Sequence, residues 1–280
     1  MKAWLRSQLE NIFTASLRVA CKQNGYASIF DRLQKIVPDI EGQYTTFKID
    51  TEYKKLKVRC QHSFQMTMVE KVCSKIDKDK LIVVDIGDSA GTHLMYLEGG
   101  AVCENKEIDA LSVNLDAVAI EKIKQNGLKG VCCRAEDLHS QPEFTGKGKV
   151  DLFLSFEMLE HLFNPVEFLY AMATKSECDY FIVTVPYVLR SRIGLHQIRN
   201  KRTDGMCAEN THIFELSPSD WNLLFSLSGW RVVDEMTYFQ YPKYHPLHVL
   251  KWLWRWFDFE GFYGVVLKKD MSIANQYKSW

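Results

Sequence analysis

The residues best placed to do chemistry form a glycine loop, Gly87–Gly91, which reads G-D-S-A-G and follows the largely apolar run Leu81–Ile86. An apolar run that ends in glycine predicts a buried parallel strand entering a tight turn. The residues from His93 onward predict a helix. Free backbone N–H groups and the helix dipole at such a junction favour an anionic or hydrogen-bonding ligand. The loop is therefore the first candidate binding site.

The types and spacing of the residues in the loop distinguish several kinds of binding or catalytic site. A dinucleotide fingerprint has the pattern G-x-G-x-x-G, whereas here Ser89 stands between Gly87 and Gly91. A P-loop requires a lysine, which this loop lacks. The same residues match the G-x-S-x-G nucleophile elbow of α/β-hydrolases. Such an elbow normally follows the fifth strand of its sheet, but the residues before Leu81 are mostly typical of helices and contain no His-Gly pair. A hydrolase with Ser89 as its nucleophile is kept as an alternative.

Short strand-like and helix-like segments alternate from Leu81 onward. Strands are predicted at 81–86, 111–115, 130–133, 150–155, 180–185, 231–239 and 262–268. Helices are predicted at 92–98, 117–126, 163–175 and 218–228. This alternation favours an α/β fold with a doubly wound parallel sheet. In such a sheet, ligands bind at the carboxyl ends of the strands.

Polar side chains follow the predicted strands where such a ligand would lie. Asn114 and Asp116 come after the second strand, where a side chain can accept hydrogen bonds from ribose hydroxyls. Glu136 and Asp137 come after the third strand, where a polar group can meet an adenine edge. The segment 155–165, which follows the fourth strand, contains carboxylates and an imidazole. Together with the glycine loop, these positions predict one site at one edge of the sheet.

The N-terminal part of the chain precedes this pattern. Residues 1–38 are predicted to form helices that cap the sheet. A further helix, predicted at 66–76, ends directly before the glycine-loop strand, so its start is expected near the ligand. Arg59, His62 and Gln65 are therefore candidate contacts.

The composition limits the class of protein. The 280 residues include 35 basic and 35 acidic ones, so a general nucleic-acid-binding surface is not expected. The eight cysteines include no C-x-x-C pair, which predicts reduced, buried thiols in a cytoplasmic protein rather than a disulfide framework or a zinc site. Polar residues near the N-terminus interrupt any signal-peptide core. No apolar run approaches the ~20 residues that cross a bilayer.

The segment Leu81–Lys269 resembles the class I S-adenosylmethionine-dependent methyltransferases. Four motifs in chain order carry the resemblance: D-I-G-x-x-x-G from Asp85, A-E-D-L from Ala135, E-M-L-E-H-L-F-N-P from Glu157 and H-x-F-x-L-S-P-x-x-W from His212. The resemblance implies a mostly parallel, seven-stranded, Rossmann-like sheet with one antiparallel strand. It also implies S-adenosylmethionine as the cofactor. The chain would then divide into a helical N-terminal extension, residues 1–57, and a methyltransferase domain, residues 58–280.

The resemblance also implies which residues contact the cofactor. They are Asp85, Gly87, Ser89, Gly91, Asn114, Asp116, Glu136 and Asp137, and Gln65 is added from its position before the strand. Two departures from the family pattern matter. Ser89 replaces a glycine, which is tolerable if its Cβ faces away from the cofactor. The usual ribose-binding acid aligns with Asn114, two positions before Asp116, so the choice between these two residues stays open.

A narrower resemblance concerns a metal ion. The pattern E-x-x-E-H with a distal histidine is similar to that of two groups, the ubiquinone-pathway O-methyltransferases and the small-RNA 3′-terminal 2′-O-methyltransferases. It implies that Glu157, Glu160, His161 and His212 hold a divalent ion against the acceptor hydroxyls. A bound cation lowers the pKa of a hydroxyl, and these ligands suit Mg²⁺, Mn²⁺, Fe²⁺ or Zn²⁺. Without a metal, His161 or His212 would be the general base, with Glu157 among the catalytic residues.

Two further stretches bear on the acceptor. Five cations fall within residues 190–202, and arginine binds phosphate well, so a phosphate-bearing acceptor is one interpretation and a solvated loop is the other. Residues 241–262 are rich in aromatic side chains and predict a helix. It would pack as core or line an acceptor pocket, with peripheral membrane contact as the minority hypothesis.

The function predicted from these patterns is methyl transfer from S-adenosylmethionine to a hydroxyl. The expected acceptor is a small molecule, a sugar or a phosphate-bearing glycan, ahead of an RNA 3′ end. Two alternatives remain: the serine hydrolase, and a non-catalytic methyltransferase-like subunit. The second is kept open by Asn114 and by Arg134, which stands where an acid often precedes the A-E-D-L pattern of the family. The sequence leaves the identity of the acceptor, oxygen versus nitrogen methylation and the oligomeric state undetermined.

Overall fold

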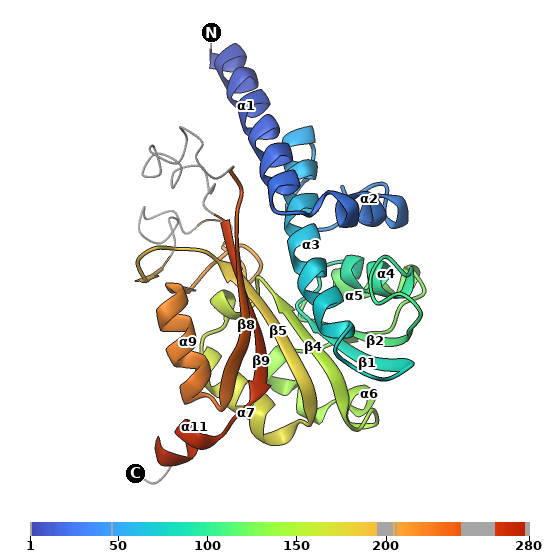
Figure 1. Ribbon diagram of the computed structural model, residues 1–280, viewed down its shortest axis with the longest axis vertical. Helices are drawn as coiled ribbons and strands as arrows, with labels where there is room; N and C mark the ends of the chain where they lie inside the picture. Colours follow the sequence, from blue (N-terminus) through green and yellow to red (C-terminus); the bar gives the residue numbers. More distant parts are fainter. Residues whose placement is uncertain (1, 46, 195–203, 205, 242–260, 278–280) are drawn as a thin grey trace.

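A computed structural model describes residues 2–45, 47–194, 204, 206–241 and 261–277 (Figure 1). The basic stretch beyond Gly194 and the aromatic stretch between Tyr241 and Gly261 therefore lie largely outside the described residues. In the described part, no helix combines the length and the apolar composition that crossing a lipid bilayer requires.

Seven strands form one sheet. They are β1 (Lys80–Ile86), β2 (Glu107–Asn114), β3 (Gly130–Cys132), β4 (Val150–Phe156), β5 (Cys178–Pro186), β8 (Trp230–Phe239) and β9 (Gly261–Lys269). Their order is β3-β2-β1-β4-β5-β9-β8, and β9 runs antiparallel to both of its neighbours while the remaining pairs are parallel. The mostly parallel, doubly wound sheet predicted from the sequence is confirmed. The strand order reverses between β1 and β4, which is where such sheets bind ligands.

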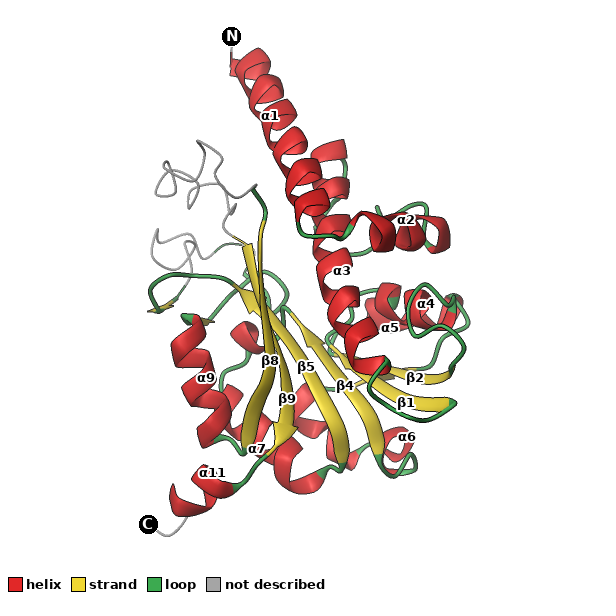
Figure 2. Ribbon diagram, viewed as in Figure 1, coloured by secondary structure: helices red, strands yellow, loops and turns green. Residues whose placement is uncertain are grey.

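Helices cover both faces of the sheet (Figure 2). The helices along the chain are α1 (Lys2–Gln23), α2 (Ala27–Ile36), α3 (Glu52–Cys73), α4 (Thr92–Glu98), α5 (Ala117–Gln125), η1 (Ala135–Ser140), α6 (Pro142–Thr145), η2 (Leu159–His161), α7 (Pro165–Lys175), α9 (Pro218–Leu227) and α11 (Ser272–Tyr277). Successive side chains of a strand point to opposite faces. Val83 accordingly joins a core cluster with residues of α1, α2 and α3, whereas Val84 joins a second cluster with residues of α7 and α9.

Helix α3 is much longer than predicted. It begins after Thr51, whose hydroxyl accepts a hydrogen bond from Lys54 N at 3.2 Å, and it runs for 22 residues. The predicted start at residue 66 missed the first four turns, and within these turns every residue from Val58 onward is buried. Polar side chains such as Arg59 and Gln65 are buried with the apolar ones, so the helical hydrophobic period is lost. The expected domain boundary at residues 57 and 58 falls inside α3.

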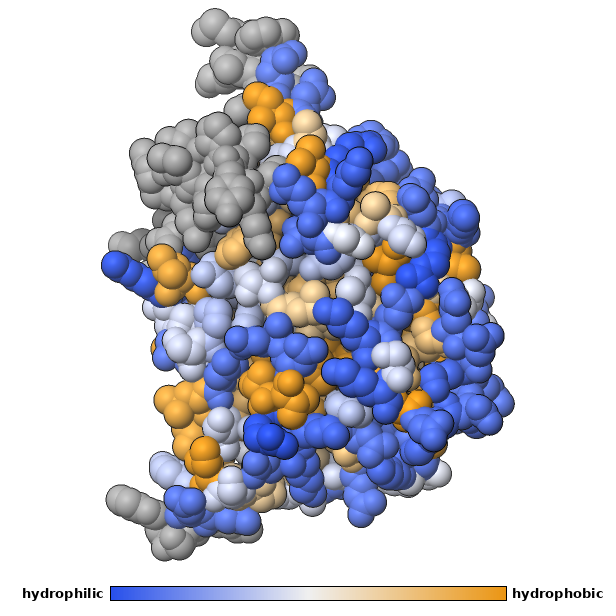
Figure 3. Space-filling view, in the orientation of Figure 1, coloured by the Kyte–Doolittle hydropathy of each residue, from blue (hydrophilic) through white to orange (hydrophobic). Residues whose placement is uncertain are grey.

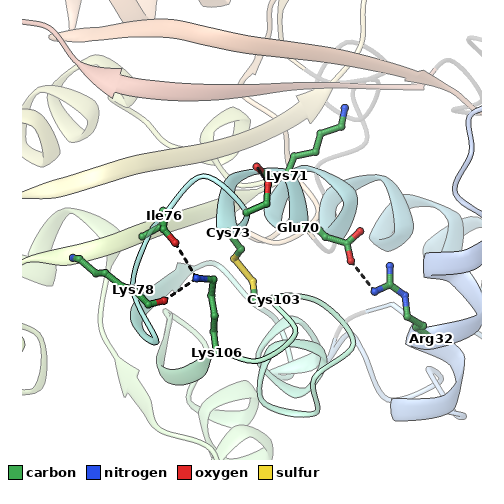
Figure 4. Close-up of a disulfide and its surroundings, with 9 residues drawn as sticks. Arg32, Glu70, Lys71, Cys73, Ile76, Lys78, Cys103 and Lys106 are labelled. Atoms are coloured by element: carbon green, nitrogen blue, oxygen red, sulfur yellow. Dashed lines mark hydrogen bonds and ion pairs between the residues drawn. A yellow bond between two sulfur atoms is a disulfide. The ribbon is translucent and has the colours of Figure 1, made fainter.

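A disulfide joins the end of α3 to the segment after α4 (Figure 4). It links Cys73 with Cys103, and both residues are buried. The expectation that all cysteines are reduced is therefore wrong for this pair. Cysteines 30 positions apart carry no local spacing signal, so the pairing becomes visible only when the fold brings α3 beside α4. The remaining six cysteines are free thiols.

Most of the face seen in Figure 3 is hydrophilic, with separate apolar patches between the polar ones. Helix α1, which protrudes at the top of Figure 1, also exposes Ile12 and Val19.

Candidate functional site

The glycine loop connects β1 to α4 through two residues with left-handed backbone. Gly87 has φ 98° and Gly91 has φ 78°. A Cβ atom on Gly87 would lie 2.8 Å from Met158 Cγ, and one on Gly91 would lie 2.9 Å from Leu128 Cδ1. At Gly91, a side chain of the protein itself therefore approaches the main chain closely. Both positions require glycine for backbone shape and for packing.

A buried cluster of acids and histidines surrounds this loop. Asp85 and Asp88 are each 1% exposed and His93 is 5% exposed. His93 Nδ1 lies 2.9 Å from Asp85 Oδ2 and 3.7 Å from Asp88 Oδ1. The ring of His62, from α3, lies 4.8 Å from the ring of His93. Sequence analysis identified Asp85 and His62 but missed Asp88 and His93, although both stand within the loop and the first turn of the following helix.

The pKa values in this cluster follow from burial and charge. Burial raises the pKa of Asp88 to about 7, with a further increase from Asp85 and an opposing effect from His93. Burial alone would lower the pKa of His93, but Asp88 and Asp85 raise it above its usual value. The pKa of His62 falls far below its usual value because of burial, His93 and Arg59. The cluster therefore favours a proton held between His93 and the two acids, beside a neutral His62.

The two residues considered for the ribose differ clearly in their contacts. Asn114 is engaged at both ends of its amide: Nδ2 donates to Asp88 O at 3.0 Å, and Oδ1 accepts from Asp116 N at 2.8 Å. Asp116 caps α5, since its Oδ1 accepts from Val118 N at 2.8 Å. Its other oxygen, Oδ2, accepts from the Thr45 hydroxyl at 2.6 Å. Asp116 thus presents a carboxylate that already binds a hydroxyl, whereas Asn114 holds the loop in shape.

The candidate contacts on α3 have different roles. Gln65 Nε2 donates to Thr184 Oγ1 of β5 at 3.1 Å, while Gln65 Oε1 is buried without a hydrogen-bond partner. Gln65 therefore lies at the end of β5. Arg59 donates to the carbonyls of Leu33 and Pro38 at 3.3 and 3.2 Å. Arg59 also donates to the Tyr96 hydroxyl of α4 at 3.3 Å, so it ties the segment after α2 to both α3 and α4.

The remaining predicted cofactor contacts lie on the surface side of the site. Glu136 is half-buried, 3.6 Å from Arg134, and Asp137 is exposed, both in η1 after β3. Ser89 is half-buried, and among the described residues no hydrogen bond joins it to a histidine. The arrangement of a serine activated by a neighbouring imidazole is therefore not formed here.

A second cluster follows β4, where the backbone of Glu157 has φ 53°. One ligand atom from each of Glu160, His161 and His212 lies within 4.8 Å of the others. Glu160 is fully buried, and neither of its carboxylate oxygens has a hydrogen-bond partner. Glu157 lies outside this group of three, but its charge contributes to the raised pKa of Glu160. Three of the four predicted metal ligands are thus brought together, with the fourth nearby.

Hydrogen bonds fix the orientation of both imidazoles. His161 Nδ1 donates to Thr211 O at 3.0 Å, and His212 Nδ1 donates to Glu215 Oε1 at 3.0 Å. Each histidine therefore keeps Nε2 available as a ligand atom, the arrangement typical of metal-binding histidines. Glu215 also accepts from Arg192 Nε. The sequence analysis missed Glu215, which stands three residues after His212.

Electrostatics in this cluster favour a bound cation. Burial, together with Glu157 and Glu215, raises the pKa of Glu160 well above its usual value. Burial and the neighbouring His212 lower the pKa of His161 to about 4, so this imidazole is neutral. Burial would raise the pKa of Glu215, but hydrogen bonds from His212 and Arg192 lower it to about 2. The site thus combines the neutral imidazole of His161 with a buried carboxyl group, on Glu160, that lacks a hydrogen-bond partner.

Comparison with known proteins supports the fold. No protein-family model matches the sequence, and no curated protein matches it. Solved structures do match in fold. An S-adenosylmethionine-dependent methyltransferase from Mesorhizobium loti has a TM-score of 0.50 and is 11% identical, with 71% of this chain and 96% of that chain covered. The O-methyltransferase of a trans-AT PKS multienzyme from Brevibacillus brevis, solved with S-adenosyl-L-homocysteine, has a TM-score of 0.51 and is 12% identical, with 82% and 81% covered.

The same fold also occurs in the [4+2]-cyclase SpnF, with a TM-score of 0.52, 11% identity and coverage of 88% and 95%. At these identities the likeness shows the fold alone. The chain therefore has the Rossmann-like fold of S-adenosylmethionine-dependent methyltransferases, and its activity has to be argued from its own residues.

Proposed function

We propose that this protein transfers a methyl group from S-adenosylmethionine to a hydroxyl oxygen, assisted by a divalent cation. The acceptor would be a small molecule, a sugar or a glycan-linked group. The observation that carries the proposal is the cluster at the end of β4. There, one ligand atom from each of His161 and His212 lies within 4.8 Å of the other and of an oxygen of the buried Glu160, whose carboxylate has no hydrogen-bond partner. The Nδ1–H groups of both histidines are already engaged.

The cofactor would bind at the switch between β1 and β4. Asp116 supplies the carboxylate for the ribose hydroxyls, because Asn114 is used within the loop. Glu136 and Asp137 lie in η1 after β3, where the adenine would be placed. The acids around the glycine loop suit the positive charge of S-adenosylmethionine. This assignment makes Asp116, rather than Asn114, the ribose-binding residue.

Glu160, His161 and His212 would hold the cation, with Glu157 beside them. Such an ion lowers the pKa of a bound hydroxyl and fixes its position. The oxygen and nitrogen donors fit Mg²⁺, Mn²⁺, Fe²⁺ or Zn²⁺. The protein's own contribution is alignment: the β4 cluster and the glycine loop hold the two reactants on neighbouring strands, so that the acceptor oxygen can meet the methyl group in line.

The basic stretch contributes less than the sequence suggested, as far as it is described. Arg192 is paired with Glu215 and so supports the β4 cluster. Arg190 is exposed and could meet a phosphate at the rim of the site. We keep a phosphate-bearing acceptor as part of the proposal.

The test is calorimetric titration with S-adenosyl-L-homocysteine and, separately, with Mn²⁺. Wild type should bind both ligands. Glu160→Gln should lose Mn²⁺ binding but should still bind S-adenosyl-L-homocysteine. Gly87→Arg should no longer bind S-adenosyl-L-homocysteine. Glu143→Gln, an exposed substitution, is the matched control and should bind both like wild type.

Each failure has a distinct meaning. If wild type binds no S-adenosyl-L-homocysteine, the methyltransferase proposal is wrong. The alternative, a non-catalytic methyltransferase-like subunit, is then favoured. If Glu160→Gln binds Mn²⁺ as wild type does, the metal assignment is wrong while the cofactor assignment stands. Ser89→Ala should retain binding and methyl transfer, whereas a serine hydrolase would lose its activity.

A further inference from the structure

A four-residue segment between α2 and α3, Gly42–Thr45, lies across the proposed cofactor site. Gln43 is buried, and its Oε1 accepts a hydrogen bond from the hydroxyl of Thr92, the first residue of α4. Lys122 Nζ of α5 donates to Gly42 O at 3.3 Å. The segment therefore bridges the two helices that follow β1 and β2. We refer to Gly42–Thr45 as the strap.

The last residue of the strap binds the proposed ribose carboxylate. Thr45 Oγ1 donates to Asp116 Oδ2 at 2.6 Å and lies 3.2 Å from Glu209 Oε2. The other Asp116 oxygen is engaged by Val118 N in the cap of α5. The hydroxyl of Thr45 is therefore bonded to the very oxygen that a ribose hydroxyl would use.

Tyr44 connects the strap to the second cluster. Burial raises the pKa of its phenol, and so do the charges of Glu157, Glu209 and Asp88. Tyr44 is thus close to acids of both the glycine loop and the β4 cluster.

The strap is fixed at its base and held over the site by polar contacts. Ile40, Ile49 and Val58 form a small buried cluster against which Tyr44 packs. Gln43 N donates to Ile40 O at 3.2 Å. The base is therefore apolar and stable, whereas the contacts with Thr92, Asp116 and Lys122 are hydrogen bonds that a polar ligand can replace.

We propose that the strap controls access of the cofactor, with Thr45 competing with the ribose hydroxyls for Asp116. This inference rests on the proposed function, since it requires a nucleoside at Asp116. Binding of the cofactor breaks the Thr45–Asp116 hydrogen bond and releases the strap. The affinity for the nucleoside is therefore lower than it would be without the Thr45–Asp116 hydrogen bond. The difference corresponds to the free energy of that bond.

The experiment is titration of S-adenosyl-L-homocysteine into wild type, Thr45→Val and Thr45→Ser. Valine keeps the shape of threonine without its hydroxyl, so Thr45→Val should bind about five- to tenfold more tightly, as expected for one hydrogen bond. Thr45→Ser keeps the hydroxyl and should stay within about twofold of wild type. In an Asp116→Asn background, where overall affinity drops, the gain from Thr45→Val should disappear.

Hydrogen exchange gives a second measurement on wild type itself. Amides of the strap should exchange faster when S-adenosyl-L-homocysteine is saturating, because Thr45 is released. Unchanged or slower exchange on binding, or equal or weaker binding by Thr45→Val, would overturn the strap proposal and leave the proposed function standing. If neither wild type nor Thr45→Val binds the nucleoside, both proposals fall together. Thermal denaturation of each variant identifies a loss of folding, and in that case the exchange measurement on wild type decides.

Discussion

Glu160 and Asp88 are both buried acids with raised pKa values, yet their neighbours differ. Asp88 has His93 beside it, and the two can share a proton within the cluster. Glu160 has His161 3.8 Å away, but this imidazole is neutral because its pKa is about 4. The guanidinium of Arg192 is paired with Glu215. The first cluster holds a proton shared between His93 and the acids, whereas the second would, under the proposed function, be completed by an added cation.

Asp88 should make the stability of the ligand-free protein depend on pH. Its pKa rises from 3.8 to about 7 on folding, so the folded state holds the proton more tightly. The resulting stabilisation is complete below pH 3.8 and is lost as the pH rises through about 7. The raised pKa of His93 acts in the same direction. Urea denaturation should therefore give a free energy of unfolding about 1 kcal/mol lower at pH 8 than at pH 6. Asp88→Asn should reduce this difference, and an unchanged difference would contradict the assignment.

Alanine substitutions at Gly91 and Gly127 should separate the free-energy cost of left-handed backbone from the cost of overpacking. Their φ angles are 78° and 77°, but a Cβ on Gly91 would meet Leu128 at 2.9 Å, whereas one on Gly127 would meet nothing within 4 Å. Gly127→Ala should cost about 1 kcal/mol of unfolding free energy from the left-handed backbone alone. Gly91→Ala should cost about 2–4 kcal/mol because overpacking is added. Equal costs in urea denaturation would show that Leu128 moves aside freely.

Among the elements, α3 has the most connections to the site. One helix places His62 against His93, Gln65 against Thr184, and Arg59 against the carbonyls of the N-terminal helices. The sequence located the last eight residues of α3 and missed the first fourteen. Polar side chains that are buried by long-range contacts leave no local pattern. The strands were easier to predict, because β1, β4 and β5 are apolar runs buried on both faces.

The disulfide between Cys73 and Cys103 should stabilise the junction of α3 and α4. It closes a loop of 30 residues, for which loop-closure entropy predicts about 3 kcal/mol. Cys73→Ser with Cys103→Ser should therefore lower the urea midpoint relative to the oxidised protein. Wild type treated with reductant is the matched control and should unfold at the same midpoint as the double variant. A double variant as stable as the oxidised protein would show that the cross-link does not constrain the unfolded chain.

At the scale of the whole molecule, the doubly wound, mostly parallel sheet could be predicted, since it follows from the alternation of strands and helices. The place of the site, inferred from polar residues at strand ends, stays a prediction. The sequence could not predict that Asn114 is engaged on both sides, nor that Thr45 reaches Asp116 across 71 positions of the chain. Such contacts depend on how loops fold back over the sheet. The N-terminal helices were expected as a cap, and they form part of one core: Leu17 and Leu33 share a cluster with Leu154 of β4.

Because the N-terminal helices and the sheet share one core, they should unfold cooperatively. Leu17 of α1 is fully buried, whereas Ile12 on the same helix is 49% exposed. Leu17→Ala should lower the unfolding free energy by about 2–5 kcal/mol and should increase amide exchange in β4. Ile12→Ala, the matched control, should change stability by about 0.5 kcal/mol or less. If Leu17→Ala loosened α1 while β4 kept its protection, the extension would fold independently of the sheet.

The bond between Cys73 and Cys103 also has a topological consequence. The backbone from one cysteine to the other contains β1, the glycine loop and α4, so the disulfide makes this stretch a covalent ring. After a peptide bond is cut anywhere inside the ring, the disulfide would still join the two fragments covalently. On a non-reducing gel such a nicked protein would migrate as one chain. It would separate into two fragments only after reduction, with the cut locating the exposed part of the ring.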